Sequence, residues 1–287
     1  MESMPDRSEV FHAISENAFE VIERRVGVWE RLYRNAALRK AVLLVVLAAI
    51  WEIYGRWVGD RLLFPSFSQT IEAFFSSLGS GELPQAAATS IMLLLKGYSL
   101  GLLLAILLTA VASVTRIGAD LLETLTSMFH PLPSVALLPI AFMWFKLGDS
   151  GIIFVLVHAV LWSVALNTYA GFRAVSPTLR MVGRNYGLST LGYITRILIP
   201  GAFPSILTGL KIGWAFAWRT LIAAELVFGA RSGRGGLGRY IYERKNALET
   251  SDVFAGLLTV ILLGLIVESL IFKTIEKRTV RRWGMET

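Results

Sequence analysis

Long apolar runs, separated by short stretches rich in polar residues, Gly and Pro, make up most of the chain. A helix needs about 20 apolar residues to cross the hydrocarbon core of a bilayer. Six windows approach or exceed that length: residues 41–58, 88–114, 121–145, 151–174, 205–228 and 253–272. The pattern therefore predicts an all-α integral membrane protein with about six transmembrane helices.

The start of the chain follows a different pattern, in which apolar and charged positions alternate at helical spacing from Phe11 to Ala36. A basic helix with aromatic residues on its apolar side is typical of a helix lying along a membrane surface. A soluble helix packed on a partner protein is the alternative. We therefore expect an interfacial amphipathic segment over 1–40, a transmembrane domain over 41–272 and a basic cytoplasmic tail over 273–287.

Short motifs predict local structure around the first two windows. In "FPSFSQTIEAFFSSLGSG", Ser66 or Ser68 can cap a short amphipathic helix. Gly79 or Gly81 can end it. Small residues four positions apart are typical of close helix packing in membranes. Such pairs occur in the second and fifth windows: Gly97 with Gly101, and Gly209 with Gly213.

The third window is interrupted by "HPLPS", which places His130, Pro131 and Pro133 at membrane depth. Two prolines so close together predict a kink or a broken helix, whose freed carbonyl groups need a polar cavity or a neighbouring helix. We therefore assign these three residues to a candidate pathway through the membrane. His158, isolated among apolar residues in the fourth window, is interpreted as a core histidine rather than a metal ligand.

Composition narrows the class further. The 287 residues are 54% apolar, carry a formal net charge of +7 and include no cysteine. Lys and Arg flank the apolar windows, a distribution that orients membrane proteins and does not indicate nucleic-acid binding. The lack of thiols excludes disulfides, thiolate metal sites and cysteine nucleophiles.

Basic residues also predict the orientation. They precede the first window, lie between the fourth and fifth, and follow the sixth. With six spans, these three groups fall on one side of the membrane, so we expect both termini in the cytoplasm. The loop 229–252 departs from this rule, because it must be external and yet contains Arg231, Arg234, Arg239, Arg244 and Lys245. Either this loop faces an acidic partner or an anion, or one span is miscounted.

One face of the fifth window combines aromatic and charged residues. At about 100° per residue, an arc of roughly 80° holds Lys211, Trp214, Trp218, Ile222 and Glu225. Such a face should line a path or a subunit contact instead of meeting lipid, so we assign Lys211, Trp214 and Trp218 to the candidate pathway. Arg219 lies near the middle of the window, about 80° from Lys211. Ionisable groups at this depth indicate function, so we expect Arg219 to favour anions in the pathway and Glu225 to help close an external gate. Hydrogen bonding between helices, with no role toward a solute, stays an open alternative.

The connection 176–204 between the fourth and fifth windows is far longer than an ordinary loop. It begins with a Ser-Pro pair typical of a helix start, and Gly187 interrupts the helical pattern. A second helix can start at Ser189 or Thr190, and Pro200 precedes the fifth window. The length and the bend predict a protein docking element made of two short helices. A linker that folds back on its own bundle is the alternative.

This loop resembles the "EAA" loop of binding-protein-dependent ABC importer permeases in the spacing of Gly187, Ile197, Ile199 and Pro200. The three residues that name the motif are replaced here by "MVG" at 181–183. Further segments, "FPSFSQTIEAF", "HPLPSVALLPIAFMWFKLG" and "PSILTGLKIGWAFAWRTLIAAEL", are similar to the nitrate, sulfonate and taurine branch, and their order matches that of the family. Together these segments cover most of the chain after residue 40.

The resemblance implies a type I ABC importer permease that pairs with a second copy of itself in the bacterial inner membrane. Two cytoplasmic ATPase subunits would bind ATP and Mg²⁺, and a periplasmic or extracellular solute-binding protein would deliver the solute. This chain would then be no enzyme and hold no cofactor. The implied solute is a small anion such as a sulfonate, taurine, nitrate or an organic carboxylate. The residues implied to couple to the ATPase are Arg184, Tyr186, Gly187, Leu188, Leu191, Ile197 and Pro200.

Other motifs bear on competing functions. No "GxxxxGK[ST]" occurs, so the energy for transport must come from another subunit. "GRGGLG" at 233–238 follows a membrane helix instead of a strand, and we interpret it as a flexible external turn, not a dinucleotide site. A secondary transporter driven by an ion gradient is the alternative function, but it gives no reason for the long docking loop. A membrane enzyme would need clustered catalytic groups, and the three scattered histidines with no arrangement of nucleophiles argue against one.

Overall fold

The computed structural model describes residues 35–146, 148–228 and 235–282, and these ranges contain helices and turns but no strand. This confirms the all-α fold class. The chain divides into two compact units, 1–50 and 51–287. Helix α2 (Ala36–Val58) covers the boundary between them. The part of the predicted interfacial segment at 1–34 lies outside the described residues.

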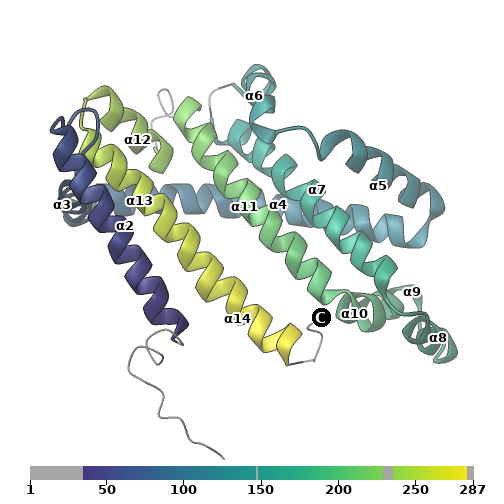
Figure 1. Cartoon of the computed structure of the whole chain (residues 1–287). Coiled ribbons are helices and arrows are strands. Elements are labelled where there is room, and N and C mark those ends of the chain that lie inside the picture. Colours follow the sequence, from purple (N-terminus) through teal and green to yellow (C-terminus); the bar gives the residue numbers. More distant parts are fainter. Residues whose placement is uncertain (1–34, 147, 229–234, 283–287) are drawn as a thin grey trace, which may run out of the picture. The chain divides into compact units, whose positions relative to one another are not determined.

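Helices of very different lengths follow α2 along the chain (Figure 1). They are α3 (Phe67–Gly79), α4 (Glu82–Val114), α5 (Arg116–Phe129), α6 (Leu138–Phe145), α7 (Asp149–Ala174), α8 (Pro177–Asn185), α9 (Thr190–Tyr193), α10 (Ile199–Gly201), α11 (Phe203–Phe228), α12 (Leu237–Asn246), α13 (Thr250–Ile266) and α14 (Lys273–Glu276). Short 3₁₀ or π-helical segments join some of them: η2 (Ser134–Leu137), η3 (Ile194–Leu198), η4 (Val267–Phe272) and η5 (Lys277–Arg281).

Within the described ranges, three continuous helical segments are long and apolar enough to cross a membrane: Glu82–Val114, Asp149–Ala174 and Thr250–Arg281. Two bent pairs raise the number to five if each pair is one span: Arg116–Phe129 with Ser134–Phe145, and Thr190–Gly201 with Phe203–Val227. These five coincide with the last five apolar windows of the sequence. The first window, 41–58, is helical within α2 but is not among the five, so a sixth crossing stays a prediction.

The turn before α3 folds as its sequence predicts. The Ser66 side chain accepts a hydrogen bond from the Gln69 amide, and the Gln69 side chain accepts one from the Ser66 amide. This reciprocal cap starts α3, which ends at Gly79. The Trp51 ring lies 5.7 Å from the Phe254 ring, centroid to centroid. Helix α3 also packs on α13, so the connection between α2 and α4 is fixed to the bundle.

Helix α7 is the most buried of the three continuous spans and packs against both α4 and α11. Glycines allow the close approach. A Cβ atom on Gly97 would lie 2.6 Å from Leu156 Cβ. For Gly101, Gly209 and Gly213, the nearest α7 atoms would be 2.8, 2.8 and 3.1 Å away. The small-residue pairs predicted from the sequence therefore lie at the interfaces of α7.

The third span breaks at "HPLPS", as expected. Helix α5 ends at Phe129, and the segment Ser134–Phe145 leaves at an angle of 87°. Pro131 and Pro133 have no amide hydrogen, so the helical hydrogen-bond ladder cannot continue through them. The η2 turn after the break contacts both α7 and α11. The break therefore brings polar backbone beside α7 and α11.

The helix that holds the sixth window continues past residue 272, where the transmembrane domain is predicted to end. Residues 273–281 continue the preceding helix through α14 and η5. Phe272 and Val280 are buried against α11, and the Lys211 amine lies 2.6 Å from a Glu276 carboxylate oxygen. Charged residues between the apolar ones mask this helical spacing in the sequence, and the cytoplasmic position of 273–287 stays a prediction.

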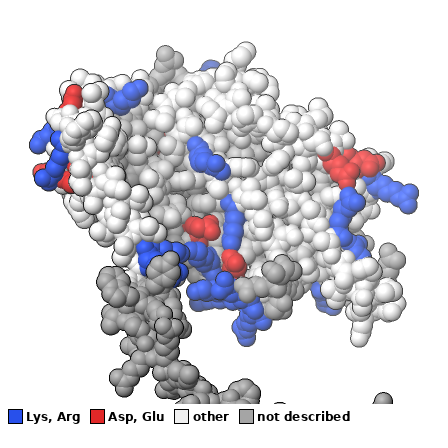
Figure 2. All heavy atoms as spheres, in the orientation of Figure 1, with Lys and Arg blue, Asp and Glu red and all other residues white. Residues whose placement is uncertain are grey.

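The surface of the spanning helices is largely apolar. Large apolar side chains are exposed along α4 and α13, among them Leu103, Leu107, Ile261 and Leu265. Figure 2 shows that most of the visible face carries no Lys, Arg, Asp or Glu. Soluble proteins rarely expose apolar surface of this extent, so the described helices suit a lipid environment.

Substituting Gly97 with Ala tests the contact between α4 and α7. The added methyl group would lie 2.6 Å from Leu156 Cβ. Overpacking of this kind typically costs about 1–3 kcal/mol of stability. Gly79→Ala is the matched control, since its methyl group would meet nothing within 4 Å. We expect a lower thermal unfolding midpoint in detergent for Gly97→Ala only, and equal midpoints for the two variants would contradict the close packing.

Candidate functional site

Helices α8 to α10, residues 177–201, form a bent segment between α7 and α11 that we call the elbow. Gly187 stands at the bend with φ +60°, a left-handed conformation that favours glycine. Ser189 caps α9, because its side chain accepts a hydrogen bond from the Gly192 amide at 3.3 Å. The predicted pair of short helices with a bend at Gly187 is confirmed. Figure 1 shows the elbow and α12 at opposite ends of α11.

The tip of the elbow presents apolar side chains to the outside. Tyr186 is 80% exposed and Leu191 is 72% exposed, while Leu188 is half-buried. A Cβ atom on Gly187 would meet nothing within 4 Å. The side chain of Arg184 lies outside the described part of the structure. An exposed tyrosine and leucine at a protruding bend are typical of a protein docking surface.

The remaining predicted coupling residues lie at the root of the elbow. Ile197 is half-buried against an apolar cluster that includes Phe172 on α7 and Leu198 on η3. Pro200 lies in α10, directly before the 75° bend into α11. These residues do not reach the tip. They join the elbow to the two spanning helices that flank it.

Two residues that the sequence interpretation missed make this root rigid. The Arg180 guanidinium donates to the carbonyl oxygens of Phe172 at 2.6 Å and Val175 at 3.0 Å. These carbonyls belong to the last turn of α7, whose groups have no partner within the helix. A Cβ atom on Gly183 would lie 2.8 Å from the Tyr193 ring, so α8 and α9 pack closely. Only the folded contacts identify these roles, although a basic residue shortly after a helix is a weak signal of capping.

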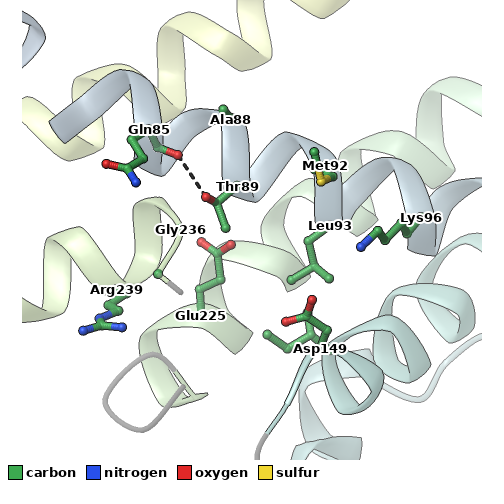
Figure 3. A pocket seen from close by; sticks show the side chains of 12 residues that line it. Gln85, Ala88, Thr89, Met92, Leu93, Lys96, Asp149, Glu225, Gly236 and Arg239 are labelled. Carbon is green, nitrogen blue, oxygen red and sulfur yellow. Dashed lines mark hydrogen bonds between the residues drawn. The ribbon is translucent and has the colours of Figure 1, made fainter. Parts of the chain in front are cut away.

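At the other end of α11, a pocket of about 300 Å³ lies between α4, α7, α11 and the start of α12. In Figure 3, Glu225 points from α11 toward α4, and Asp149 faces the same space from the start of α7. Lys96 and Arg239 also line this pocket. Its wall therefore carries charges of both signs, and we call it the outer pocket.

Glu225 holds three elements together at the outer pocket. Its side chain is buried, and the Ser90 hydroxyl on α4 lies 2.8 Å from both carboxylate oxygens. The Gly238 amide donates to the carboxylate at 2.9 Å, and the Leu237 amide donates to the Ser90 hydroxyl at 2.8 Å. The carboxylate thus ties the end of α11 to α4 and α12.

The described part of the glycine-rich motif, which the sequence predicts to be a flexible external turn, packs closely against Glu225. A Cβ atom on Gly236 would lie 2.1 Å from Glu225 Oε1, and one on Gly238 would lie 2.5 Å from Glu225 Cβ. Glycine is needed here for close approach to a carboxylate. The first part of the motif, 233–234, lies outside the described residues.

Ion pairs neutralise part of the basic loop that contains α12. Arg244 pairs with Glu249 and Glu82, and Arg239 lies 2.6 Å from Glu243. Hydrogen bonding to Glu249, and then to Glu82, raises the pKa of Arg244. The loop therefore uses some of its cations to hold α12 against α4, which reduces the charge left for a partner.

A second pocket, of about 330 Å³, lies where the third span breaks, between η2, α7 and α11. We call it the mid-span pocket. It brings together four residues that the sequence assigned to the pathway: His130, Pro131, Pro133 and Arg219. The Arg219 guanidinium carbon lies 5.1 Å from the centre of the Phe216 ring, and Arg219 Nε donates to the Ala215 carbonyl at 3.0 Å.

His158 and Trp162 also line the mid-span pocket, and the sequence interpretation did not assign them to the pathway. His158 Nδ1 lies 3.2 Å from the Ser134 hydroxyl oxygen. The Trp162 ring stacks on Phe129 with centroids 5.3 Å apart. His158 and Trp162 are four residues apart on α7 and hence on one face. That spacing was the available signal, but the identity of the facing elements required the fold.

The other predicted pathway residues lie between helices. Lys211 pairs with Glu276, the Trp214 ring lies 5.5 Å from the Tyr98 ring, and Trp218 is buried. The face predicted on the fifth window is therefore divided. Glu225 and Arg219 line separate pockets, while the other three contribute to helix contacts, and their role toward a solute stays a prediction.

Comparison with known proteins shows which family the sequence matches. Residues 97–281 match the sequence profile of the family described as binding-protein-dependent transport system inner membrane component. SsuC of Escherichia coli, named for aliphatic sulfonates transport, is 31% identical over 77% of this chain and 83% of its own length. The nitrate import permease protein NrtB of Synechocystis is 28% identical over 84% and 88%. The taurine transport system permease protein TauC of Escherichia coli is 26% identical over 83% and 86%.

Removing the Glu225 carboxylate should release the turn before α12. Glu225→Ala leaves the Ser90 hydroxyl and the Gly238 amide without their acceptor, and a buried unpaired group costs about 1–3 kcal/mol. We expect hydrogen–deuterium exchange of amides in 236–240 to accelerate about tenfold or more. Glu225→Gln, which keeps an acceptor oxygen, should stay near the wild type. Unchanged protection in Glu225→Ala would contradict the assigned hydrogen bonds.

Proposed function

Since the chain belongs to the family of binding-protein-dependent transport system inner membrane components, we propose that its elbow is gripped by a separate ATPase, which drives import through this permease. The relatives are transport permeases, so the chain is a transport subunit and not an enzyme. The observation that carries the proposal is the exposed apolar tip of the elbow around Gly187. An ordinary connection between two spans would bury such side chains or replace them with polar ones.

The root of the elbow supports its use as a lever. Arg180 fixes the elbow to the end of α7, and the cluster around Phe172 and Leu198 joins it to the approach to α11. A force applied at the tip is therefore passed to two spanning helices together. These helices are themselves packed closely through Gly209 and Gly213, so they respond as one body rather than bending separately.

Transport then follows an alternating-access scheme. When ATP binding closes the ATPase pair, the elbow moves, and α7 and α11 tilt with it. The outer pocket lies at the far end of α11, where Glu225 links α11 to α4 and α12. Movement of α11 changes this link, so Glu225 acts as part of the external gate, while the mid-span pocket with Arg219 belongs to the route of the solute.

The complete importer contains more than this chain. A second copy supplies the other wall of the pathway, and two cytoplasmic ATPase subunits bind ATP and Mg²⁺ and dock on the two elbows. A solute-binding protein docks on the outer face. The permease lies in the bacterial inner membrane with both termini in the cytoplasm, as the basic residues flanking the spans favour.

The transported solute is a small anion. The printed names of SsuC, NrtB and TauC refer to aliphatic sulfonates, nitrate and taurine. Arg219 at the middle of α11 supplies a positive charge where a passing anion would lose its hydration. We therefore assign a sulfonate, taurine, nitrate or a small carboxylate to this permease.

Gly187→Val tests the lever. Valine at φ +60° strains the bend and changes the tip without meeting other atoms; the backbone cost is about 1–2 kcal/mol. Gly59→Val is the matched control, because Gly59 also has a positive φ, +69°, and open space around it. We expect Gly187→Val to lose most ATPase co-purification and ATP-dependent uptake in proteoliposomes, while Gly59→Val keeps both.

The thermal unfolding midpoints of the two variants show whether the bundle is intact. If Gly187→Val keeps normal ATPase association and uptake, the elbow is not the surface through which the ATPase binds and drives the permease. If uptake by the wild type needs no ATPase but follows an imposed ion gradient, the chain is a secondary transporter and the proposal fails.

A further inference from the structure

We propose that the mid-span pocket is a binding site for a small organic oxyanion, a sulfonate or carboxylate, with Arg219, Trp162 and His158 as its ligands. That this anion is the transported solute rests on the proposed transport function. The charge of the pocket, its unpaired hydrogen-bond donors and its shape support the binding site itself.

The charge of the pocket favours an anion. No Asp or Glu is found among the described residues that line it, whereas Arg219 does line it. Arg219 uses Nε for the Ala215 carbonyl and forms no ion pair with a described carboxylate. A guanidinium without a counter-ion at membrane depth is costly. An anionic occupant would remove that cost, and the two terminal nitrogens of the guanidinium suit a two-oxygen contact.

Two buried ring nitrogens lack partners beside this cation. Trp162 is only 8% exposed, and its Nε1 has no hydrogen-bond partner among the described residues. His158 Nε2 is also buried and has no hydrogen-bond partner among the described residues. A buried N–H without an acceptor is unfavourable by about 1–3 kcal/mol. Both side chains line the pocket, so an occupant with several acceptor oxygens would satisfy groups that the protein leaves unpaired.

The contact with Ser134 makes His158 Nε2 a hydrogen-bond donor toward the pocket. When the Ser134 hydroxyl donates to Nδ1 across the 3.2 Å contact, the neutral ring carries its proton on Nε2. Nε2 is then a donor, like Trp162 Nε1. A sulfonate has three acceptor oxygens and a carboxylate has two, whereas a cation would find three groups that repel it or donate to it.

Aromatic walls set the size and orientation of the occupant. Trp162 is held flat against Phe129 by stacking, and Phe216 lies under the Arg219 guanidinium. These contacts hold the donors in place before an anion arrives, which reduces the entropy lost on binding. The volume of about 330 Å³ admits a small organic anion with its alkyl or aryl part against the rings.

The outer pocket is a natural comparison within the same chain. Glu225 and Asp149 line it together with Lys96 and Arg239, so its charges are mixed. The Glu225 carboxylate already accepts hydrogen bonds from the Ser90 hydroxyl and the Gly238 amide. Anion preference should therefore belong to the mid-span pocket and be absent from the outer pocket.

Because the chain has no cysteine, single cysteines can report the local potential. Val135→Cys places a thiol on the wall of the mid-span pocket, and Thr89→Cys places one on the wall of the outer pocket. Each variant, in lipid nanodiscs with its candidate ATPase added, is treated with 2-sulfonatoethyl and with 2-(trimethylammonio)ethyl methanethiosulfonate. The ratio of the anionic to the cationic labelling rate is the measured quantity.

We expect this ratio to be higher at residue 135 than at residue 89. Adding Arg219→Gln should lower the ratio at residue 135 by about tenfold or more, because the loss of one positive charge slows the anionic reagent and speeds the cationic one, and it should leave residue 89 unchanged. Labelling of residue 135 by neither reagent, a cationic preference, or a ratio independent of Arg219 would overturn the anion site.

Protection by ethanesulfonate tests the buried donors. Ethanesulfonate should slow labelling of Val135→Cys, and Trp162→Phe, which keeps the ring but removes the N–H, should weaken protection about tenfold, as for a hydrogen bond to a charged group. Trp144→Phe is the matched control, since Trp144 is exposed and does not line the pocket. Equal protection in both tryptophan variants would reject Trp162 as a ligand. If ethanesulfonate does not protect Val135→Cys at all, the site itself is rejected.

The two levels of the proposal can fail separately. ATPase co-purification of the Val135→Cys variant, and its ATP-dependent uptake after reconstitution in proteoliposomes, are measured on the same purified protein. Intact uptake without an Arg219-dependent labelling ratio contradicts the mid-span site alone. An Arg219-dependent ratio without any ATPase association contradicts the importer and leaves the anion site standing.

Discussion

The close packing of α7 between α4 and α11 is the constraint on which the rest of the structure depends. Side chains larger than hydrogen at Gly97 or Gly209 would meet α7 atoms within 2.8 Å. In lipid, where apolar side chains gain little by leaving their solvent, such van der Waals contact is a main source of helix association. Both the elbow and the mid-span pocket are parts of this packed unit, because α7 leads into one and lines the other.

Charge is distributed along α11 by the neighbours that each position meets. Lys211 is neutralised by Glu276 near one end, and Glu225 is held by hydroxyl and amide donors near the other. Arg219, between them, faces the break in the third span, where the described residues offer it no carboxylate. The helix thus has two positions satisfied by the protein and one, Arg219, to which we assign an outside anion as partner. This division gives a physical reason for the type of solute inferred from the relatives.

Local signals in the sequence predicted local structure well. The φ of Gly187, the Ser66 cap and the break at Pro131 and Pro133 each follow from the chemistry of a few neighbouring residues. Contacts between distant segments could not be predicted in this way. Helical spacing placed Glu225 on a face but could not reveal Ser90, 135 positions away, as its partner. The same holds for the mid-span pocket, whose wall comes from three separate segments.

The central claim, that a separate ATPase grips the elbow, is tested most directly by cross-linking the purified complex. Leu191→Cys and Leu248→Cys place single thiols at similarly exposed leucines, 72% and 67%, on the elbow and beyond α12 respectively. A short maleimide–succinimide cross-linker should join the ATPase to the chain with Leu191→Cys and not to the chain with Leu248→Cys. Cross-linking of the ATPase through residue 248, with none through residue 191, would contradict the account.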